Sequence, residues 1–194
     1  RPEDPNGEEI LVWSPNGKEI LFTDNDVSDA RKDQDSGIYA VEVATGNLRT
    51  LMGREFVDGI WIAPSRFSIS PLGLLAFEYI GDIYTVEFLL DENGLVQVDP
   101  QAEWIAIAIG DPPEELNEWP VWSPDGTYLA FRSRDVSVDL EQLIIYDMVL
   151  DEFITVVQGD VYPHQVTWSP DGSEIGFLDG SVTANGKGAT LDIY

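Results

Sequence analysis

Cysteine is absent from the sequence, which removes both disulfide bonds and a thiol nucleophile from consideration. The absence fits a secreted protein as well as a cytosolic one. Long apolar runs are also missing, because none approaches the roughly 18 to 20 residues that cross a bilayer as a helix. No signal sequence is recognisable at Arg1, and we expect a soluble chain without membrane insertion.

Positive charge is scarce. Ten Lys and Arg residues stand against 36 Asp and Glu, which gives a formal net charge of −26 at pH 7. Nucleic acid and anionic membrane are disfavoured as ligands, because both require a clustered cationic surface. The acidity has two interpretations: a solvated surface tuned for solubility, as in a saline habitat, or a local site for a cation or a cationic partner.

Sequence signatures of catalysis are missing as well. There is no Gly-x-Ser-x-Gly elbow, no His-Glu-x-x-His zinc motif and no phosphate-binding glycine loop. A Ser-His-Asp triad would have to use His164, the single histidine, yet no serine is marked as an activated nucleophile. Carboxylate pairs for glycoside hydrolysis are unavoidable among so many acids and therefore uninformative. The sequence predicts a protein that is not an enzyme.

What the sequence does contain is a repeated five-residue motif. Trp-Ser-Pro-Asp-Gly occurs at 122–126 and 168–172, with a near copy at 13–17 and a degraded copy at 69–73. Proline presets φ for a type I turn, and Asp and Gly suit the positions that follow, so each copy predicts a hairpin corner. The motif prolines lie 56, 53 and 46 residues apart, a period typical of propeller blades.

Strand patterns flank every copy. The first strand ends at the Trp or Ile of the motif, and the second follows the corner and ends at or just after a Phe. The third carries a Tyr, and alternation of apolar and polar residues is clear at 38–43 and 83–88. The aromatic residues concerned are Phe22, Phe77, Phe131, Phe177, Tyr39, Tyr84, Tyr146 and Tyr194.

These patterns predict an all-β propeller of four-stranded antiparallel blades. The blades cover approximately residues 8–53, 65–100, 119–159 and 164–194. The repeated Trp, Phe and Tyr residues are expected to fill the space between neighbouring sheets, where each buried side chain contributes roughly 2–3 kcal/mol. Blade four has no fourth strand before Tyr194, so we expect a segment of a larger ring, completed by further blades or another copy of the chain.

The units resemble the WD-like repeat of the periplasmic TolB propeller over nearly the whole chain. Blades one, three and four match that repeat closely, whereas blade two has Ile69 in place of Trp and Leu72 in place of Asp. The resemblance implies the fold more strongly than a function. The same repeat occurs in Tol-system proteins, in propellers attached to prolyl-oligopeptidase-type hydrolases and in other secreted proteins.

In such a propeller one side carries the long connections between the second and third strands and between successive blades. Tyr162 and His164 lie at the start of blade four, and Trp119 holds the matching place in blade three. We consider these three as ligand-binding candidates. The alternative is that they are packed residues at the edge of the core, which is the commoner role of a lone histidine or tryptophan.

The loop after the second strand is rich in aspartate. Asp24, Asp26, Asp29, Asp33 and Asp35 resemble in composition the oxygen-rich loops that hold Ca²⁺, a cation that takes six to eight such ligands. The acidic residue expected about twelve positions after the first ligand is missing. A calcium site and a solvated acidic loop are the two interpretations.

These observations predict a binding or scaffolding module that recognises a protein or peptide through its loop-rich side. We expect it to be extracellular or periplasmic. Two alternatives stay open. One is an accessory propeller that gates access to a prolyl-oligopeptidase-type hydrolase, and the other is a calcium- or carbohydrate-binding propeller.

The calcium interpretation predicts an ion-specific stabilisation. If the five aspartates converge on Ca²⁺, CaCl₂ should raise the melting temperature more than NaCl of equal ionic strength, because ligand binding stabilises the folded state. General screening acts alike in both salts. Thermal melts should be repeated with Asp33→Asn and Asp35→Asn combined. Equal shifts in both salts, or a calcium-specific shift that survives the double substitution, would leave the solvated loop.

Overall fold

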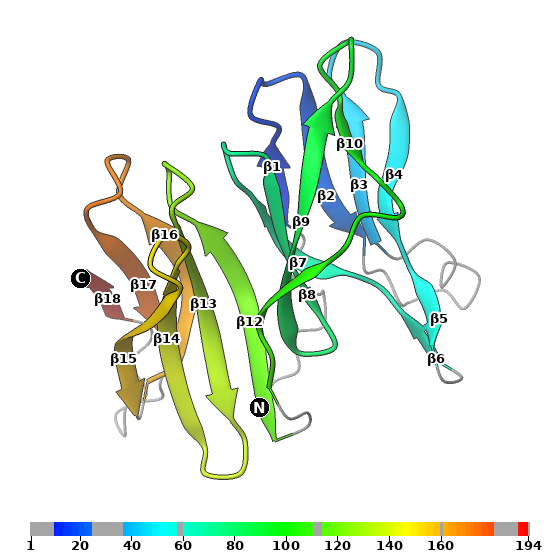
Figure 1. The fold of residues 1–194 in the computed structure, drawn as a ribbon. Coiled ribbons are helices and arrows are strands. Elements are labelled where there is room, and N and C mark those ends of the chain that lie inside the picture. Colours follow the sequence, from blue (N-terminus) through cyan, green and yellow to red (C-terminus); the bar gives the residue numbers. More distant parts are fainter. Residues whose placement is uncertain are drawn as a thin grey trace.

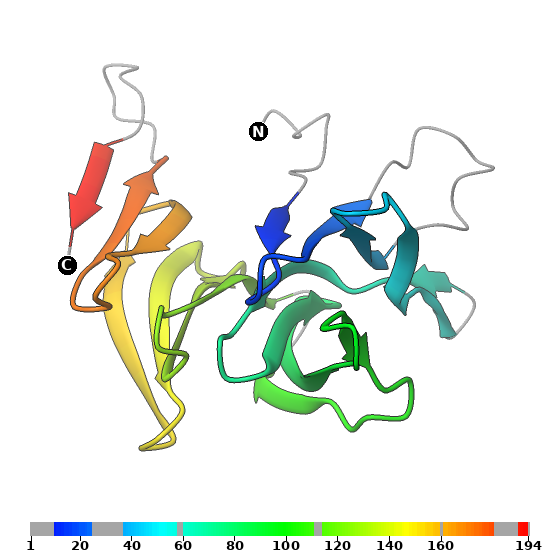
Figure 2. The ribbon, with the colours of Figure 1, turned by 90° about the horizontal axis from the view of Figure 1, so that it is seen from above.

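The computed structural model describes residues 10–24, 37–57, 60–110, 114–159, 161–180 and 190–193. Every regular element in these ranges is a strand, and none of them contains a helix that could cross a membrane. The strands form four antiparallel sheets and one small hairpin (Figure 1). Seen from above, the sheets stand side by side along an arc that runs from blade 1 to blade 4 (Figure 2). The predicted all-β propeller architecture is confirmed.

Each blade is built from consecutive hairpins, and we name its strands A to D in chain order. Blade 1 contains β1 (Leu11–Trp13), β2 (Glu19–Asp24), β3 (Gly37–Glu42) and β4 (Leu48–Gly53). Blade 2 contains β7 (Ser65–Ile69), β8 (Leu74–Tyr79), β9 (Asp82–Leu90) and β10 (Val96–Val98). Blade 3 contains β12 (Glu115–Trp122), β13 (Tyr128–Asp135), β14 (Leu140–Asp147) and β15 (Glu152–Gly159). Blade 4 contains β16 (Pro163–Trp168), β17 (Ile175–Asp179) and β18 (Thr190–Ile193).

Two connections expected to be loops contain strands. The connection from blade 1 to blade 2 holds the hairpin of β5 (Glu55–Val57) and β6 (Ile60–Ile62). After β10, the segment β11 (Ile105–Ala108) pairs with β9 along the same edge, so the outer strand of blade 2 is in two pieces. Strand β12 also begins at Glu115, earlier than the predicted start of blade three near residue 119. Because acidic and proline residues flank these segments, the sequence pattern did not predict them as strands.

The repeated motif forms the same corner in blades 1, 3 and 4, and a corner one residue shorter in blade 2. In blade 4 the Gly172 amide donates to the Ser169 carbonyl at 2.9 Å, and Gly172 has φ 72°. The Ser169 hydroxyl donates to Asp171 Oδ1 at 2.7 Å and accepts from the Glu174 amide at 2.9 Å. Hydrogen bonds from the hydroxyls of Ser169 and then Ser173 hold the pKa of Asp171 at about 2. The corner is therefore fixed by its own side chains.

Each sheet has two different faces. In blade 3, one face carries Trp122, Leu129 and Phe131, which are 6%, 0% and 1% exposed. We call it the aromatic face; its residues lie two before and five and seven after the motif proline. Residues three before and six after the proline, Val121 and Ala130, lie on the opposite, small-residue face, because adjacent strand residues point to opposite sides. The aromatic face of blade 3 packs on Ala76, Ile83 and Ala108 of blade 2.

The same contact forms the other two blade boundaries. Leu75 and Phe77 of blade 2 pack on Leu21 and Ala40 of blade 1. In blade 4 the aromatic face consists of Trp168, Ile175 and Phe177, and it packs on Ala130 and Leu143 of blade 3. The Trp168 indole also donates to the Val121 carbonyl at 3.2 Å. Every aromatic face in blades 2 to 4 thus covers the small-residue face of the preceding blade.

Trp13 is the exception to the predicted burial of the motif tryptophans. The four equivalent residues do end their A strands, β1, β7, β12 and β16, as the motif predicts. Trp13, however, is 58% exposed and its neighbour Leu11 is 64% exposed. The prediction that Trp13 belongs to the core is wrong, because its face looks away from blade 2, and burial at this position comes from a preceding blade.

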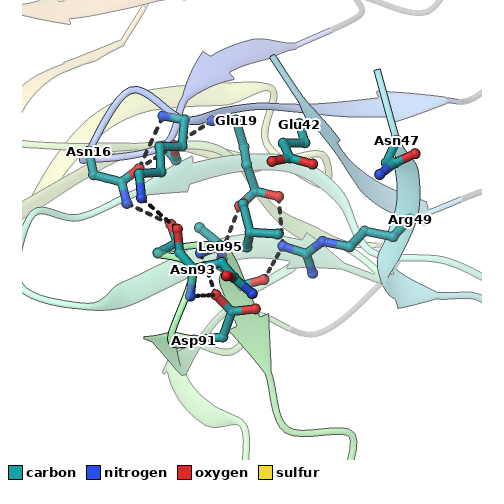
Figure 3. Close-up of polar contacts among 12 residues, drawn as sticks. Asn16, Glu19, Glu42, Asn47, Arg49, Asp91, Asn93 and Leu95 are labelled. Carbon is teal, nitrogen blue, oxygen red and sulfur yellow. Dashed lines mark hydrogen bonds and ion pairs between the residues drawn. The ribbon is translucent and has the colours of Figure 1, made fainter. Parts of the chain in front are cut away.

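A polar contact also joins blades 1 and 2 on the side of the A–B and C–D turns (Figure 3). Glu19 is fully buried and accepts hydrogen bonds from the Val96 amide at 2.6 Å and from Arg49 at 2.7 Å. Arg49 donates to the Val96 carbonyl as well. Nearby, Asn16 Nδ2 donates to the Gly94 carbonyl at 2.6 Å. A buried charge is thus matched by a cation from its own blade and by the backbone of the next.

The boundary contact predicts unequal effects for equivalent tryptophans. Trp122→Ala should lower the free energy of unfolding by about 3–5 kcal/mol, because it leaves a cavity between blades 2 and 3. Trp13→Ala removes the same group from an exposed surface and should cost about 0.5 kcal/mol or less. Urea unfolding of dilute protein measures both losses. Equal losses would contradict the packing described above.

Candidate functional site

The starts of the A strands and the B–C turns lie on one side of the molecule, which we call the loop-rich side; it is the lower side in Figure 1. In three blades the A strand has a register shift there. At each shift the residue five before the motif proline has positive φ: 37° for Arg66, 62° for Trp119 and 50° for Gln165. Such backbone costs on the order of 1–3 kcal/mol for a residue other than glycine, and bulges of this kind redirect side chains.

A row of charged and aromatic side chains begins at the first of these bulges. Arg66 Nη1 donates to the two carboxylate oxygens of Glu78 at 3.1 and 2.8 Å, within blade 2. It also donates to Glu118 Oε1 of blade 3 at 3.2 Å. The Arg66 guanidinium lies 4.5 Å from the ring centroid of Trp119, a separation at which a cation is attracted to the indole face. Arg66 therefore connects blades 2 and 3.

Arg132 continues the row toward blade 4. Its side chain is 6% exposed, and it donates to Glu118 and forms an ion pair with Glu141 at 3.3 Å. Its guanidinium lies 4.6 Å from the ring centroid of Tyr162. Glu141 also pairs with Arg134 at 3.2 Å. Glu118 and Glu141 are also largely buried, where an unpaired charge would be strongly destabilising. Each of these carboxylates forms ion pairs with two arginines of the network.

Tyr162 and His164 form the end of the row. Their ring centroids are 5.9 Å apart, and His164 Nδ1 lies 3.1 Å from the Tyr162 carbonyl oxygen. The Tyr162 amide donates to Asp179 Oδ1 at 2.9 Å, and its carbonyl accepts from the Gly180 amide at 3.0 Å. A Cβ on Gly180 would lie 2.9 Å from Tyr162 Cδ1 and 3.0 Å from His164 Cε1. The glycine allows both rings to approach the end of β17.

The structure thus connects the three candidates predicted from the sequence. Tyr162 and His164 are neighbours, whereas Trp119 stacks with Arg66 and is linked to them through Glu118 and Arg132. Their role in binding stays a prediction. Sequence reasoning missed the charged residues of the row. Three of the six Lys and Arg residues within the described ranges lie in this row, and the fold brings them together from distant parts of the sequence.

Comparison with solved structures identifies the fold. No protein-family model and no curated protein matches the chain. TolB from Acinetobacter baumannii is 16% identical to it, with a TM-score of 0.60 over 96% of this chain and 41% of that chain. The chain has the TolB-like propeller fold. At this identity the likeness concerns the fold alone.

Two other solved structures share the TolB-like propeller. Oligogalacturonate lyase from Vibrio parahaemolyticus is 15% identical, with a TM-score of 0.55 over 92% of this chain and 50% of that chain. The tricorn protease is 10% identical, with a TM-score of 0.53 over 89% of this chain and 15% of that chain. The chain therefore spans half or less of the length of TolB and of these two enzymes.

The rim of the loop-rich side carries exposed apolar side chains beside acids. Ile80, in the β8–β9 turn, is 50% exposed and has φ 56°. Val136 and Val138, in the β13–β14 turn, are 41% and 67% exposed. Asp82 and Asp139 flank these turns. Exposed apolar groups with a polar rim are typical of surfaces that contact other molecules.

The acidic loop lies mostly outside the described residues. Asp24 is the last residue of β2, where it pairs with Gly37, but Asp26, Asp29, Asp33 and Asp35 are not among the residues that the structure describes. Across the described part of the chain, no group of three or more His, Asp or Glu residues is placed to hold a metal ion. The calcium site therefore stays a prediction from the sequence.

Burial dominates the titration of Glu78. Desolvation raises the pKa of its carboxyl above 4.5, and the Arg66 guanidinium opposes this only in part. A raised pKa in the folded state means that the stability contributed by Glu78 is present below pH 4.5 and is lost as the pH rises through the folded value. At neutral pH the negative charge of Glu78 therefore lowers the free energy of unfolding.

This sign leads to a pH-dependent prediction for Glu78→Gln. The melting temperature of the variant minus that of the unmodified chain should increase from pH 4.5 toward neutral pH, because the amide carries no charge to desolvate. Glu92→Gln, at an exposed turn, controls for the loss of one negative charge from the acidic surface. A difference that decreases over this range would show that the ion pair with Arg66 outweighs burial.

Proposed function

We propose that this TolB-like propeller segment is a non-catalytic binding module that recognises a basic protein or peptide segment through its loop-rich side. The observation that carries this proposal is the row from Arg66 to His164, which crosses three blades on repeated strained bulges. Strained backbone and partly buried ion pairs at the open ends of strands are features of binding sites more than of propeller cores.

The row offers rigid surfaces for contact. Trp119 and Tyr162 are each half-buried, and each ring is held by an arginine from the neighbouring strand or blade. Aromatic side chains fixed in this way bind with little loss of conformational entropy. Ile80 and Val138 at the turn tips supply apolar area around them. A partner that spans blades 2 to 4 would contact all of these groups at once.

The charge of the loop-rich side favours a cationic partner. In blades 2 to 4, acidic residues of this side outnumber its arginines nine to three: Glu78, Asp82, Glu114, Glu115, Glu118, Asp135, Asp139, Glu141 and Asp179, against Arg66, Arg132 and Arg134. All three arginines are already engaged by carboxylates. An anionic ligand such as an acidic sugar would have to displace those carboxylates, whereas a Lys or Arg side chain meets a surplus of negative charge.

We propose the periplasm or the extracellular space as its location, and the likeness to the TolB fold supports this proposal. A second candidate function is supported by the tricorn protease, where the matching region is 15% of a longer chain. In that case the module would be an accessory propeller of a hydrolase. A Gly-x-Ser-x-Gly segment in sequence beyond Tyr194 would favour this candidate over independent binding.

Panning a displayed library of random peptides on the chain tests the proposed function. Peptides with Lys or Arg next to an apolar residue should be enriched, and their affinity should fall with added salt, since surface charges are screened. Trp119→Ala combined with Tyr162→Ala should weaken a selected peptide at least about tenfold, as expected for central aromatic contacts. Isothermal titration calorimetry measures the change.

Leu150→Ala is the matched control for this experiment, because Leu150 is 65% exposed in the β14–β15 turn on the opposite side. It should leave affinity unchanged, and thermal melts should show that both proteins are folded. Enrichment of acidic peptides, or equal binding by the double variant, would contradict the proposal.

A further inference from the structure

Four aromatic rings gather where blade 2 meets blade 1. Phe77 is fully buried, and its ring centroid lies 4.9 Å from that of Trp104 and 6.1 Å from that of Tyr84. Tyr79, Tyr84 and Trp104, which we call the ring cluster, are half-buried and pack against the apolar core between the two blades. Part of each of these three residues is therefore open to solvent.

Two members of the ring cluster depart from the repeat. Trp104 directly precedes β11, the second piece of the outer strand of blade 2, and the pairing of β11 with β9 holds Trp104 beside Tyr84. In blades 1 and 3 the outer strand is a single piece. Tyr79 stands two residues after the Phe of strand B, where the other blades carry Asp24, Ser133 and Asp179. The packing of neighbouring blades therefore does not by itself require these two rings.

The rings of the cluster lie at steep angles to one another. The planes of Tyr79 and Tyr84 meet at 80° and those of Tyr79 and Trp104 at 76°, with centroids 6.2 and 5.1 Å apart. Tyr84 and Trp104 meet at 59° and 6.0 Å. Aromatic faces attract a cation that lies within about 6 Å of the ring centroid, and sets of rings at such angles hold methylated ammonium groups.

The charges that act on the ring cluster are negative. Burial raises the pKa of Tyr79 above its ordinary value, and the carboxylate of Glu55, where β5 begins, raises it further. Burial raises the pKa of Tyr84 as well, together with the charge of Asp82 and a hydrogen bond between the two side chains. Asp82 is 9% exposed and also accepts from the Gly110 amide at 2.8 Å. These surroundings favour a positively charged ligand.

We propose that the ring cluster binds a quaternary ammonium group. Such a group combines a positive charge with an apolar surface of methyl groups, and it has no N–H that needs an acceptor. An unmodified lysine has three such hydrogens to satisfy, whereas Asp82 is already engaged by Gly110 and Tyr84. A small molecule of the choline type and a trimethylated lysine side chain both present this group. The site is separate from the row between Arg66 and His164.

Titration of the isotope-labelled chain with choline, followed by nuclear magnetic resonance, tests this proposal. The indole resonance of Trp104, identified by its loss in Trp104→Phe, should shift and saturate. The uncharged isostere of choline, in which carbon replaces nitrogen, should bind at least about tenfold more weakly, because it is not attracted to the ring faces as a cation. Tyr79→Ser, which introduces the residue of blade 3, should weaken choline about fivefold or more. Glu55→Gln, at an exposed position, should weaken it about twofold without altering a ring.

Phe153→Leu is the matched control, because Phe153 is 56% exposed and contacts the ring of Tyr146 in blade 3. It should leave choline binding unchanged, and thermal melts should show that all variants are folded. Equal binding of choline and its isostere, or choline binding that survives Tyr79→Ser, overturns the proposal.

A peptide that carries trimethyllysine, compared with the same peptide carrying lysine, distinguishes the two sources of the group. Tighter binding by the methylated peptide than by choline assigns the site to a protein ligand, and equal or weaker binding assigns it to a small molecule. If neither choline nor the methylated peptide shifts the Trp104 resonance, the proposal is wrong. That result would leave the proposed recognition of a basic segment intact, because its test depends on Trp119 and Tyr162.

Discussion

The contact between an aromatic face and a small-residue face is the interaction on which the rest of this structure depends. Each sheet alone is too thin to bury its own apolar residues, and the buried clusters form where apolar residues of one blade meet those of the blade before it. Cations strengthen the same boundaries. Lys18, Arg49, Arg66 and Arg132 each reach the neighbouring blade. A chain with few positive charges thus places most of those described where two acidic units meet.

The row on the loop-rich side shows how this arrangement supplies a site. Arg66 and Arg132 are needed between blades, yet each also holds an aromatic ring at the surface. Buried ion pairs add little net stability compared with apolar packing. We therefore infer that the ion pairs of Arg66 and Arg132 mainly fix side chains from three blades in one geometry. The site and the blade boundaries are therefore parts of one network.

Local features of the fold could be predicted from the sequence, and longer-range ones could not. The corner at Ser169–Gly172 is held by hydrogen bonds between residues no more than five apart in the sequence. The burial of Trp122 and the exposure of Trp13 depend on which sheet lies opposite, and their immediate sequences are alike. The pair of Arg66 and Glu118 joins residues 52 apart in the sequence. No spacing rule indicates such a pair, so the charged row became visible only in three dimensions.

The aromatic faces of blades 2 to 4 all look back toward the amino-terminal end of the chain, and this direction matters during synthesis. The amino-terminal part of a chain leaves the ribosome first, and each blade pairs only consecutive hairpins. A newly made blade therefore brings its Trp and Phe residues to a small-residue surface that is already in place. If the aromatic faces pointed toward the carboxy-terminal end instead, each new aromatic surface would stay exposed to other nascent chains until the next blade, some fifty residues, had been translated.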